Sequence, residues 1–193
     1  VNAVNDAPAF TSPAAFSVPE DTTPVGTVAA TDVEASAIAY SISGGADAAL
    51  FTINPTTGAL SFNAAPNFEA PADAGANNVY NLIVTASDGS NTPTQAITVT
   101  VTNVNETPVI TSGNAVNVPE NTTAVTTVTS TDGDGDTVTY AIVGGADAAR
   151  FMLNATTGAL SFIAPPNFEA PNDSDANNTY IVAVTASDGT ATT

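Results

Sequence analysis

Alternation of apolar and polar residues is the main regularity along this chain of 193 residues, and it predicts β-strands. Residues 97–101 place Ile, Val and Val at every second position with Thr between them, and residues 80–86 alternate in the same way. A period of two puts alternate side chains on opposite faces of a half-buried strand. Clusters of Gly, Pro, Asn and Asp separate these runs at positions typical of turns. Only residues 46–50 suggest a helix, of one or two turns.

The whole pattern repeats after 100 residues without a gap, and 53 of the 93 positions that can be compared are identical. The repeat predicts two tandem domains, residues 1–103 (with 1–8 as an N-terminal linker) and residues 104–193. Residues 94–100 of the first copy, which alternate cleanly, have no counterpart in the second. We therefore expect the second domain to lack its last strand in this chain, as in a piece cut from a longer array.

Seven or so short strands in about 100 residues predict an all-β fold, a Greek-key β-sandwich in each copy. The apolar residues at alternating positions should fill the space between the two sheets of each sandwich. We expect this core to contain, together with the residues 100 positions further on, Phe16, Val28, Tyr40, Ile42, Phe51, Ile53, Leu60, Phe62, Phe68, Tyr80, Leu82, Val84, Ile97 and Val99.

The charge of the chain excludes several classes of function. It has 19 acidic residues, a single basic residue (Arg150) and neither His nor Cys, which gives a net charge of −18. Nucleic acids and anionic membranes are bound through Lys and Arg, so neither is an expected partner. Serine or cysteine triads, the usual zinc sites and disulfides all need residues that this chain lacks. No apolar run reaches the roughly 18 residues of a membrane span.

Carboxylates are concentrated near predicted strand ends and loops instead of being scattered among basic residues. Two carboxylates about 5 Å apart at an effective dielectric near 20 repel by roughly 3 kcal/mol, so a fold that gathers several needs a counter-ion. Oxygen ligands alone favour a hard cation, and many carboxylates and amide carbonyls favour Ca²⁺ over Mg²⁺. These acidic positions are Glu20, Asp32, Glu34, Glu69, Asp88, Glu106, Glu120, Asp132, Asp134, Asp136, Glu169 and Asp188.

Five motifs follow one another in the same order and with the same spacing as in one known family. They are Pro19-Glu20, Phe51-x-Ile53 with Thr57-Gly58-x-Leu60, Phe68-Glu69, Ala86-x-Asp88-x-Ser90 and Val104-Asn105-Glu106-Thr107-Pro108. Together they resemble the cadherin repeat, most closely the bacterial cadherin-like repeats of large secreted or surface-anchored adhesins. The resemblance covers both copies. It implies two tandem cadherin-like domains, an extracellular location and a Ca²⁺ cluster at each junction between successive repeats.

The resemblance also implies which residues hold the ions. Asn67 stands where the family usually has Asp, and the linker is one residue shorter than in the family pattern. These departures leave open whether the junction holds two or three ions. The half-junctions at the two ends of the chain should bind more weakly, through Asp6, Asp32, Glu34 and Asp88 at one end and Glu120 and Glu169 at the other. The central junction would use Glu20, Glu69, Asn103, Asn105, Glu106, Asp132, Asp134 and Asp188, with Asp136 as a further candidate.

Other interpretations of the acidic motifs remain open. Residues 132–136 also suit a solvent-exposed turn, because Asp and Gly are the usual turn residues. Residues 173–177 begin like an EF-hand loop but lack its Gly and its closing Glu, so they suggest a separate ion only weakly.

Three hypotheses can be compared with the sequence, and of these the enzymatic one is not expected. The leading hypothesis is a Ca²⁺-stiffened extender module of a large bacterial extracellular adhesin, which supports cell adhesion or biofilm attachment through neighbouring repeats of the same chain. The second is a carbohydrate-binding or homophilic module, although aromatic residues are only 6% and fall mostly on predicted core positions. The third, a hydrolase with paired carboxylates, would need an asymmetric pocket, whereas the acids here recur in both copies. A subunit of a surface filament or surface layer, with a neighbour supplying the missing strand, is a related possibility.

Overall fold

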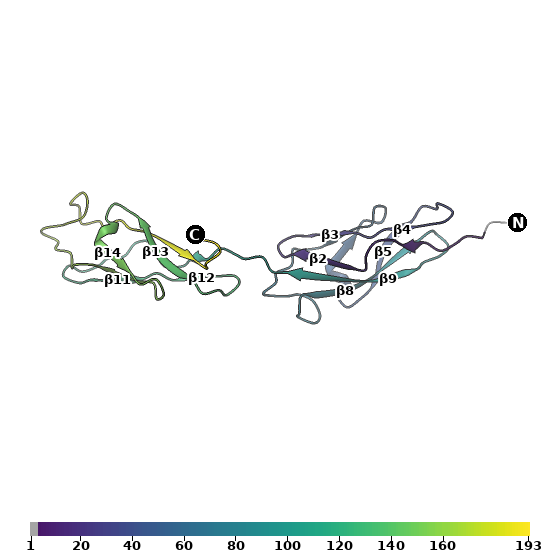
Figure 1. The fold of residues 1–193 in the computed structure, drawn as a ribbon, viewed down its shortest axis with the longest axis horizontal. Coiled ribbons are helices and arrows are strands. Elements are labelled where there is room, and N and C mark those ends of the chain that lie inside the picture. The colour runs from purple at the N-terminus through teal and green to yellow at the C-terminus, as the bar shows by residue number, and fades with distance from the viewer. Residues whose placement is uncertain (1–3) are drawn as a thin grey trace. The chain divides into compact units, whose positions relative to one another are not determined.

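A computed structural model describes residues 4–193, so residues 1–3 of the predicted linker lie outside the described part. The chain divides into two compact units, Val1–Val104 and Asn105–Thr193. Within residues 4–193 the helical elements are two 3₁₀ turns, η1 (Ala48–Leu50) and η2 (Ala148–Arg150), and every other regular element is a strand (Figure 1). The prediction of an all-β fold is confirmed, and the helix expected at residues 46–50 is a single short turn. No helix in this range is long and apolar enough to cross a membrane.

Unit 1 contains a four-stranded sheet of order β2-β9-β8-β5, a three-stranded sheet of order β3-β7-β6, and the short pair β1-β4. All pairs are antiparallel except β2 and β9, which run parallel. The long central strands β8 and β9 correspond to the two alternating segments of the sequence. The bounds are β1 (Ala9–Phe10), β2 (Ala15–Pro19), β3 (Pro24–Thr27), β4 (Ala30–Thr31), β5 (Ala39–Gly44), β6 (Phe51–Ile53), β7 (Ala59–Phe62), β8 (Val79–Ser87) and β9 (Thr94–Thr102).

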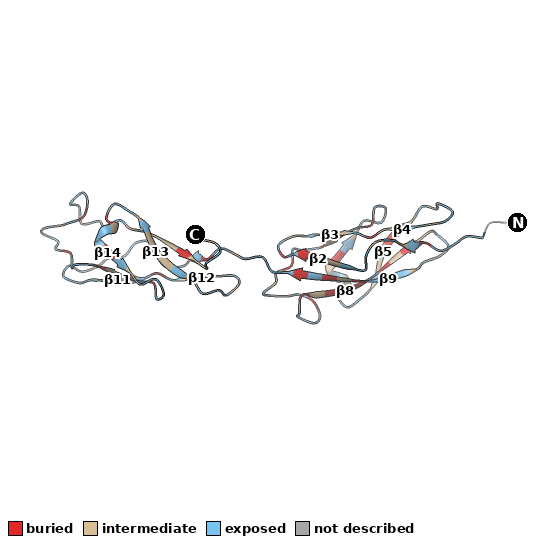
Figure 2. Ribbon diagram, in the orientation of Figure 1, coloured by how far each residue is buried: buried red, intermediate tan, exposed pale blue. Residues whose placement is uncertain are grey.

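The core of unit 1 lies where the apolar positions of these strands meet (Figure 2). The ring centroids of Phe51 and Phe62 lie 4.4 Å apart, and the ring of Tyr80 packs edge-on against both. The exposed fractions of Ile97 and Val99 in β9 are 1% and 0%. The expected core is largely confirmed. The structure adds Val18, Ala86 and Val101 to it, and places Phe16, Ile42, Ile53 and Phe68 at its partly buried edge.

Unit 2 repeats this architecture with fewer strands. Its pairings β11-β15-β14, β13-β16 and β10-β12 follow those of unit 1, as in the register of Phe151 opposite Phe162 and of Tyr140 opposite Ala186. The four-stranded sheet of unit 1 is represented here by β13 and β16 alone. The bounds are β10 (Val109–Ile110), β11 (Ala124–Thr127), β12 (Ser130–Thr131), β13 (Thr139–Gly144), β14 (Phe151–Leu153), β15 (Ala159–Phe162) and β16 (Ala183–Ser187).

The core predicted for the second copy is only partly formed. Phe168, expected inside, is 64% exposed, and Val116, the counterpart of Phe16, is 46% exposed. Residues 115–119 form no strand, and β16 begins at Ala183, so the strand expected from residue 180 is shorter than its counterpart in unit 1. The reason is that β9 pairs with both β2 and β8 in unit 1. The corresponding segments of unit 2 have no such strand between them.

Candidate metal centre

An acidic turn follows β12 in unit 2 and brings three carboxylates together. One carboxylate oxygen from each of Asp132, Asp134 and Asp136 lies within 4.8 Å of the others. The amide of Asp136 donates to Oδ1 of Asp132 at 3.0 Å, and Gly135 takes a φ of 76° that closes the turn. Asp132 Oδ2 is buried and accepts no hydrogen bond. A buried anionic oxygen without a donor is costly, so this arrangement suits a bound cation.

The first residues of unit 2 are hydrogen-bonded onto this turn. The backbone amide of Glu106 donates to Asp134 Oδ2 at 2.8 Å, and the Asn105 side-chain amide donates to Asp188 Oδ2 at 2.9 Å. Gly133 lies so close to Glu106 that a Cβ built on it would be 2.6 Å from Glu106 Oε2. The absence of a side chain at position 133 therefore makes room for the Glu106 carboxylate. The residues that unit 2 was predicted to contribute to the central junction thus lie in one neighbourhood.

Asp188 is held in its ionised form. Hydrogen bonds from the backbone amide of Ala191 at 2.6 Å, from the side chain of Asn105, and from the amide of Thr190 lower the pKa of this carboxyl. Each of these donors favours the carboxylate over the protonated acid. Asp188 is therefore anionic throughout the neutral range.

Unit 1 builds the same arrangement at its corresponding end. Asn5 Nδ2 donates to Asp88 Oδ2 at 2.7 Å, and the Asp6 amide donates to Glu34 Oε2 at 3.0 Å. Asp32 Oδ2, like its counterpart Asp132 Oδ2, is buried and accepts no hydrogen bond. The structure therefore brings the four acids predicted for the N-terminal half-junction into one hydrogen-bonded neighbourhood.

The carboxyl of Asp88 also has a lowered pKa. The main causes are hydrogen bonds from the backbone amides of Asn91 and Ser90, and the side chain of Asn5 contributes further. Sequence analysis missed Asn5 and Asn91. The 100-residue repeat could have identified Asn5, because Asn105 was predicted, whereas Asn91 aligns with Ala191 and left no such signal.

Glu20 and Glu69 lie together at the other end of unit 1. Glu20 is only 1% exposed, and its two oxygens accept hydrogen bonds from the amides of Phe68 at 2.7 Å and Val104 at 2.9 Å. A carboxylate oxygen of exposed Glu69 lies within 4.8 Å of one from Glu20. Asn103 is exposed just after β9. The ligands that the first copy was predicted to contribute to the central junction, Glu20, Glu69 and Asn103, thus lie around the end of β9.

The corresponding residues of unit 2 are more open to solvent. Glu120 accepts a hydrogen bond from the amide of Phe168 at 3.0 Å, as Glu20 does from Phe68, but both Glu120 and Glu169 are exposed.

Two buried acids that the sequence analysis did not single out have structural roles. Asp47 accepts hydrogen bonds from the amides of Ala74 and Asn81, both at 2.7 Å, and Asp147 does the same for Ser174 and Ile181.

The EF-hand-like segment at residues 173–177 is closed by its own hydrogen bonds. The amide of Asn177 donates to Asp173, and the side chain of Asn177 donates to Asp175. These bonds shape the loop as a polar turn, so a separate ion there stays a weak prediction.

Comparison with known proteins agrees with this architecture. Residues 14–104 match the model of the Cadherin domain family. The human protocadherin-24 EC1-2 crystal structure (form II) is similar over 94% of this chain and 86% of that chain, with 20% identity and a TM-score of 0.61. Drosophila N-cadherin EC1-4 is similar over 94% of this chain and 45% of that chain, with 22% identity and a TM-score of 0.53. No curated protein sequence matches the chain. At these identities the likeness shows the fold, tandem cadherin-like β-sandwiches.

Proposed function

We propose that this chain is a Ca²⁺-binding structural module of an extracellular adhesion protein. The observation that carries the proposal is the acidic turn of residues 132–136, onto which Glu106 is hydrogen-bonded beside the Asn105–Asp188 pair. A corresponding arrangement around Asp32 and Asp88 in unit 1 supports it. Both copies of the repeat thus gather their acids in the same way, which is expected if each copy presents them to the same kind of ligand.

The donor set suits Ca²⁺. This ion takes six to eight oxygen ligands from carboxylates, amide carbonyls and water, at distances of roughly 2.3–2.6 Å. The neighbourhood offers several carboxylates, the amide of Asn105 and the buried Asp132 Oδ2, which accepts no hydrogen bond. The single basic residue, Arg150, lies in the η2 turn, and the acidic segments contain no Lys or Arg. A bound cation would replace the mutual repulsion of these acids by coordination.

We further propose that the ion site is completed between the two domains. Its ligands would be Glu20, Glu69 and Asn103 of the first domain with Asn105, Glu106, Asp132, Asp134, Asp136 and Asp188 of the second. The support is the shortness of the chain between two hydrogen bonds: the backbone amide of Val104 donates to Glu20, that of Glu106 donates to Asp134, and only Asn105 separates Val104 from Glu106 in the sequence. The Glu20 group and the acidic turn are thus both hydrogen-bonded to residues 104–106. An ion bound to both groups would restrict bending of the chain at these residues.

The biological role follows from this stiffening. Tandem copies of one domain suit a spacer, because each added copy lengthens it without needing a new fold. Extracellular Ca²⁺ sites typically have dissociation constants of about 0.1–1 mM, matched to the calcium level outside cells. The motifs resemble most closely the repeats of bacterial surface adhesins. We therefore place the chain in the extracellular stalk of such an adhesin, where it supports attachment or biofilm formation.

Distance measurements between the domains test this function. Spin labels would be attached to Cys introduced at the exposed positions Thr52 and Met152, which lie at equivalent sites outside the acidic ends. We expect a broad distance distribution in EDTA that narrows in millimolar Ca²⁺. An Asp134→Asn variant should stay broad, whereas Asp175→Asn, a matched change away from the acidic turn, should narrow like the parent. Equal widths with and without Ca²⁺ in the parent would contradict the proposed role.

A further inference from the structure

Glu69 lies in the segment between β7 and β8 of unit 1, and hydrogen bonds hold the backbone on both sides of it. Nδ2 of the Asn78 side chain donates to the carbonyl of Phe68 at 2.8 Å, and this carbonyl belongs to the peptide group that joins Phe68 to Glu69. Asn67 Oδ1 accepts a hydrogen bond from the amide of Ala70, so a second bond spans Glu69. The direction in which the Glu69 side chain leaves the backbone is therefore set by its neighbours.

Asn78 is itself fixed to the core of unit 1. It is only 9% exposed, its amide donates to Asp73 Oδ1 at 2.9 Å, and its carbonyl accepts the amide of Val101 in β9 at 2.9 Å. Its Oδ1 is buried and accepts no hydrogen bond, so the side-chain amide is oriented by the bond to Phe68. Asn78 therefore connects the backbone next to Glu69 to the central strand β9.

Glu20 closes these hydrogen bonds into a ring. One of its oxygens accepts the amide of Phe68, and the other accepts the amide of Val104, two residues beyond the end of β9. The ring runs from β9 through Asn78, Phe68 and Glu20 back to the end of β9. It thus holds both glutamates that the first domain would contribute to the ion site. Groups that are held in place before a ligand arrives lose less conformational freedom on binding.

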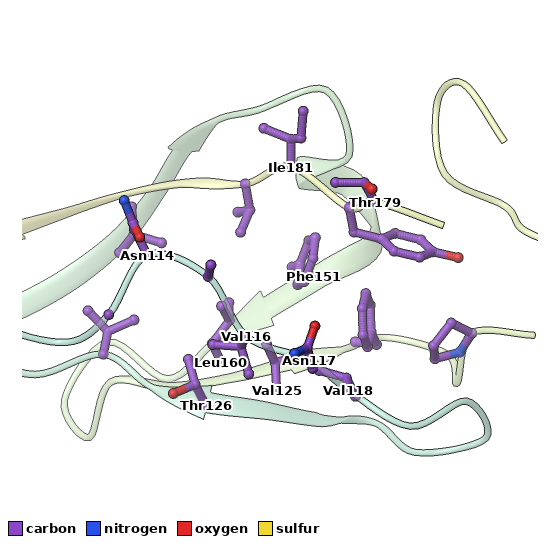
Figure 3. A pocket seen from close by; sticks show the side chains of 18 of the residues that line it. Asn114, Val116, Asn117, Val118, Val125, Thr126, Phe151, Leu160, Thr179 and Ile181 are labelled. Carbon is purple, nitrogen blue, oxygen red and sulfur yellow. The ribbon is translucent and has the colours of Figure 1, made fainter. Parts of the chain in front are cut away.

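Unit 2 repeats the side-chain bond in more open surroundings. Asn178 Nδ2 donates to the carbonyl of Phe168 at 3.1 Å, directly before Glu169. Here Glu120, Phe168 and Asn178 are among the residues that line an open groove of about 770 Å³, which Figure 3 shows from close by. The same bond can therefore be removed in a second copy whose glutamates are not among the ligands proposed for the central site.

We propose that Asn78 is a positioning residue for the Ca²⁺ site, because through Phe68 it holds Glu69 where its carboxylate can share an ion with Glu20. This inference rests on the proposed Ca²⁺ site and adds to it a residue that does not touch the ion. Asn78 has a φ of 63°, a left-handed conformation that Asn adopts more readily than most residues. Gly would serve equally well for the turn alone, so the inference concerns the side chain.

Ca²⁺ titrations of the intact 193-residue chain, followed by NMR at residues 132–136, test this inference. Asn78→Gly keeps the turn and the backbone hydrogen bonds but removes the side-chain donor, and it should raise the Ca²⁺ midpoint about tenfold. Asn178→Gly is the matched control, and its midpoint should equal that of the parent. Glu69→Ala should also raise the midpoint. Adding Asn78→Gly to Glu69→Ala should cause little further change, because the carboxylate to be positioned is already absent.

This double-mutant cycle separates positioning from a purely structural role. A structural role would weaken binding equally with and without the Glu69 side chain. That result, or an unchanged midpoint in Asn78→Gly, would overturn the inference and leave the Ca²⁺ site in place. An unchanged midpoint in Glu69→Ala would remove Glu69 from the ligand set and overturn the inference with it. Asn78→Asp keeps the size and the turn but not the donor, so it should also raise the midpoint, and it decides the test if Asn78→Gly does not fold.

Discussion

The buried carboxylate of Glu20 accepts a hydrogen bond at 2.9 Å from the backbone amide of Val104, the last residue of unit 1. Its other oxygen accepts the amide of Phe68 at 2.7 Å, so one side chain satisfies two backbone donors. Glu20 therefore fixes the end of β9 and the beginning of the linker. It is a structural residue as well as a candidate ligand.

Replacing Glu20 by Ala should destabilise unit 1 by about 3 kcal/mol, because two amides lose their acceptor in a buried position. The matched variant is Glu120→Ala in unit 2, where the side chain is exposed and accepts one hydrogen bond, from Phe168. It should cost about 1 kcal/mol or less. Urea unfolding in EDTA, followed by NMR signals of each unit, measures both. Equal losses would show that burial of Glu20 is unimportant.

Position 133 should control the geometry of Glu106. In unit 2 a Cβ at Gly133 would be 2.6 Å from Glu106 Oε2, whereas in unit 1 Val33 is combined with the shorter Asp6. Gly133→Val should therefore displace the Glu106 carboxylate and weaken Ca²⁺ binding. Adding Glu106→Asp should restore part of the affinity, because it recreates the combination of unit 1. Calorimetric affinities of the parent, both single variants and the double variant test this coupling. Additive losses would contradict it.

Asn105 should tune the acidity of Asp188. Asn105→Ala removes a hydrogen bond to the carboxylate and should raise the pKa of Asp188 toward its ordinary value. Asn5→Ala should do the same for Asp88. Carboxyl ¹³C NMR titrations in EDTA measure both. An unchanged pKa in either variant would refute the assignment.

The same lowered pKa values set the pH dependence of stability. A carboxyl that is more acidic in the folded state stabilises it fully above the unfolded pKa of about 3.9. This contribution is lost as the pH falls from there through the folded pKa. Protonation of the other acids relieves their mutual repulsion in the parent and the variants alike, so the contribution is read as a difference. As the pH falls below about 4, the melting temperature in EDTA should decline more in the parent than in the Asn5→Ala and Asn105→Ala variants.

Removal of one carboxylate in the acidic turn should abolish stabilisation by Ca²⁺ without unfolding the domain. Ca²⁺ at about 100 times its dissociation constant adds roughly 2.7 kcal/mol to the stability of a protein that binds it only when folded. Melting curves in EDTA and in millimolar CaCl₂ should therefore separate for the parent and for Asp175→Ala, but coincide or nearly so for Asp134→Ala. A Ca²⁺-dependent shift that survives unchanged in Asp134→Ala would remove this residue from the ligand set.

Much of the fold and the grouping of the acids could be predicted from the sequence. Strand β9 was predictable because Ile97, Val99 and Val101 alternate with Thr, and the structure buries these three side chains. The grouping of the acids near Asp132 and Asp188 was predictable from the resemblance to the cadherin repeat, although the ligand role itself remains a prediction.

Other features depend on tertiary contacts that no local pattern records. The burial of Glu20 requires Phe68 and Val104, which lie 48 and 84 residues away. Phe168 was wrongly predicted to be buried. The sequence around it is identical to that around Phe68, but unit 2 has no counterpart of β9 among its strands. The close approach of Gly133 to Glu106 is likewise visible only in three dimensions.

A residue-resolved Ca²⁺ titration by NMR tests the central claim most directly. In a metal-free sample we expect residues 105–106, 132–136 and 188, together with Glu20 and Glu69, to respond and saturate as one group. Asn5, Asp6, Asp32 and Asp88 should respond at higher Ca²⁺, because no preceding repeat in this chain supplies the two glutamates. Saturation of the Asp88 group before the Asp188 group, or no saturable change at either in millimolar Ca²⁺, would contradict the account.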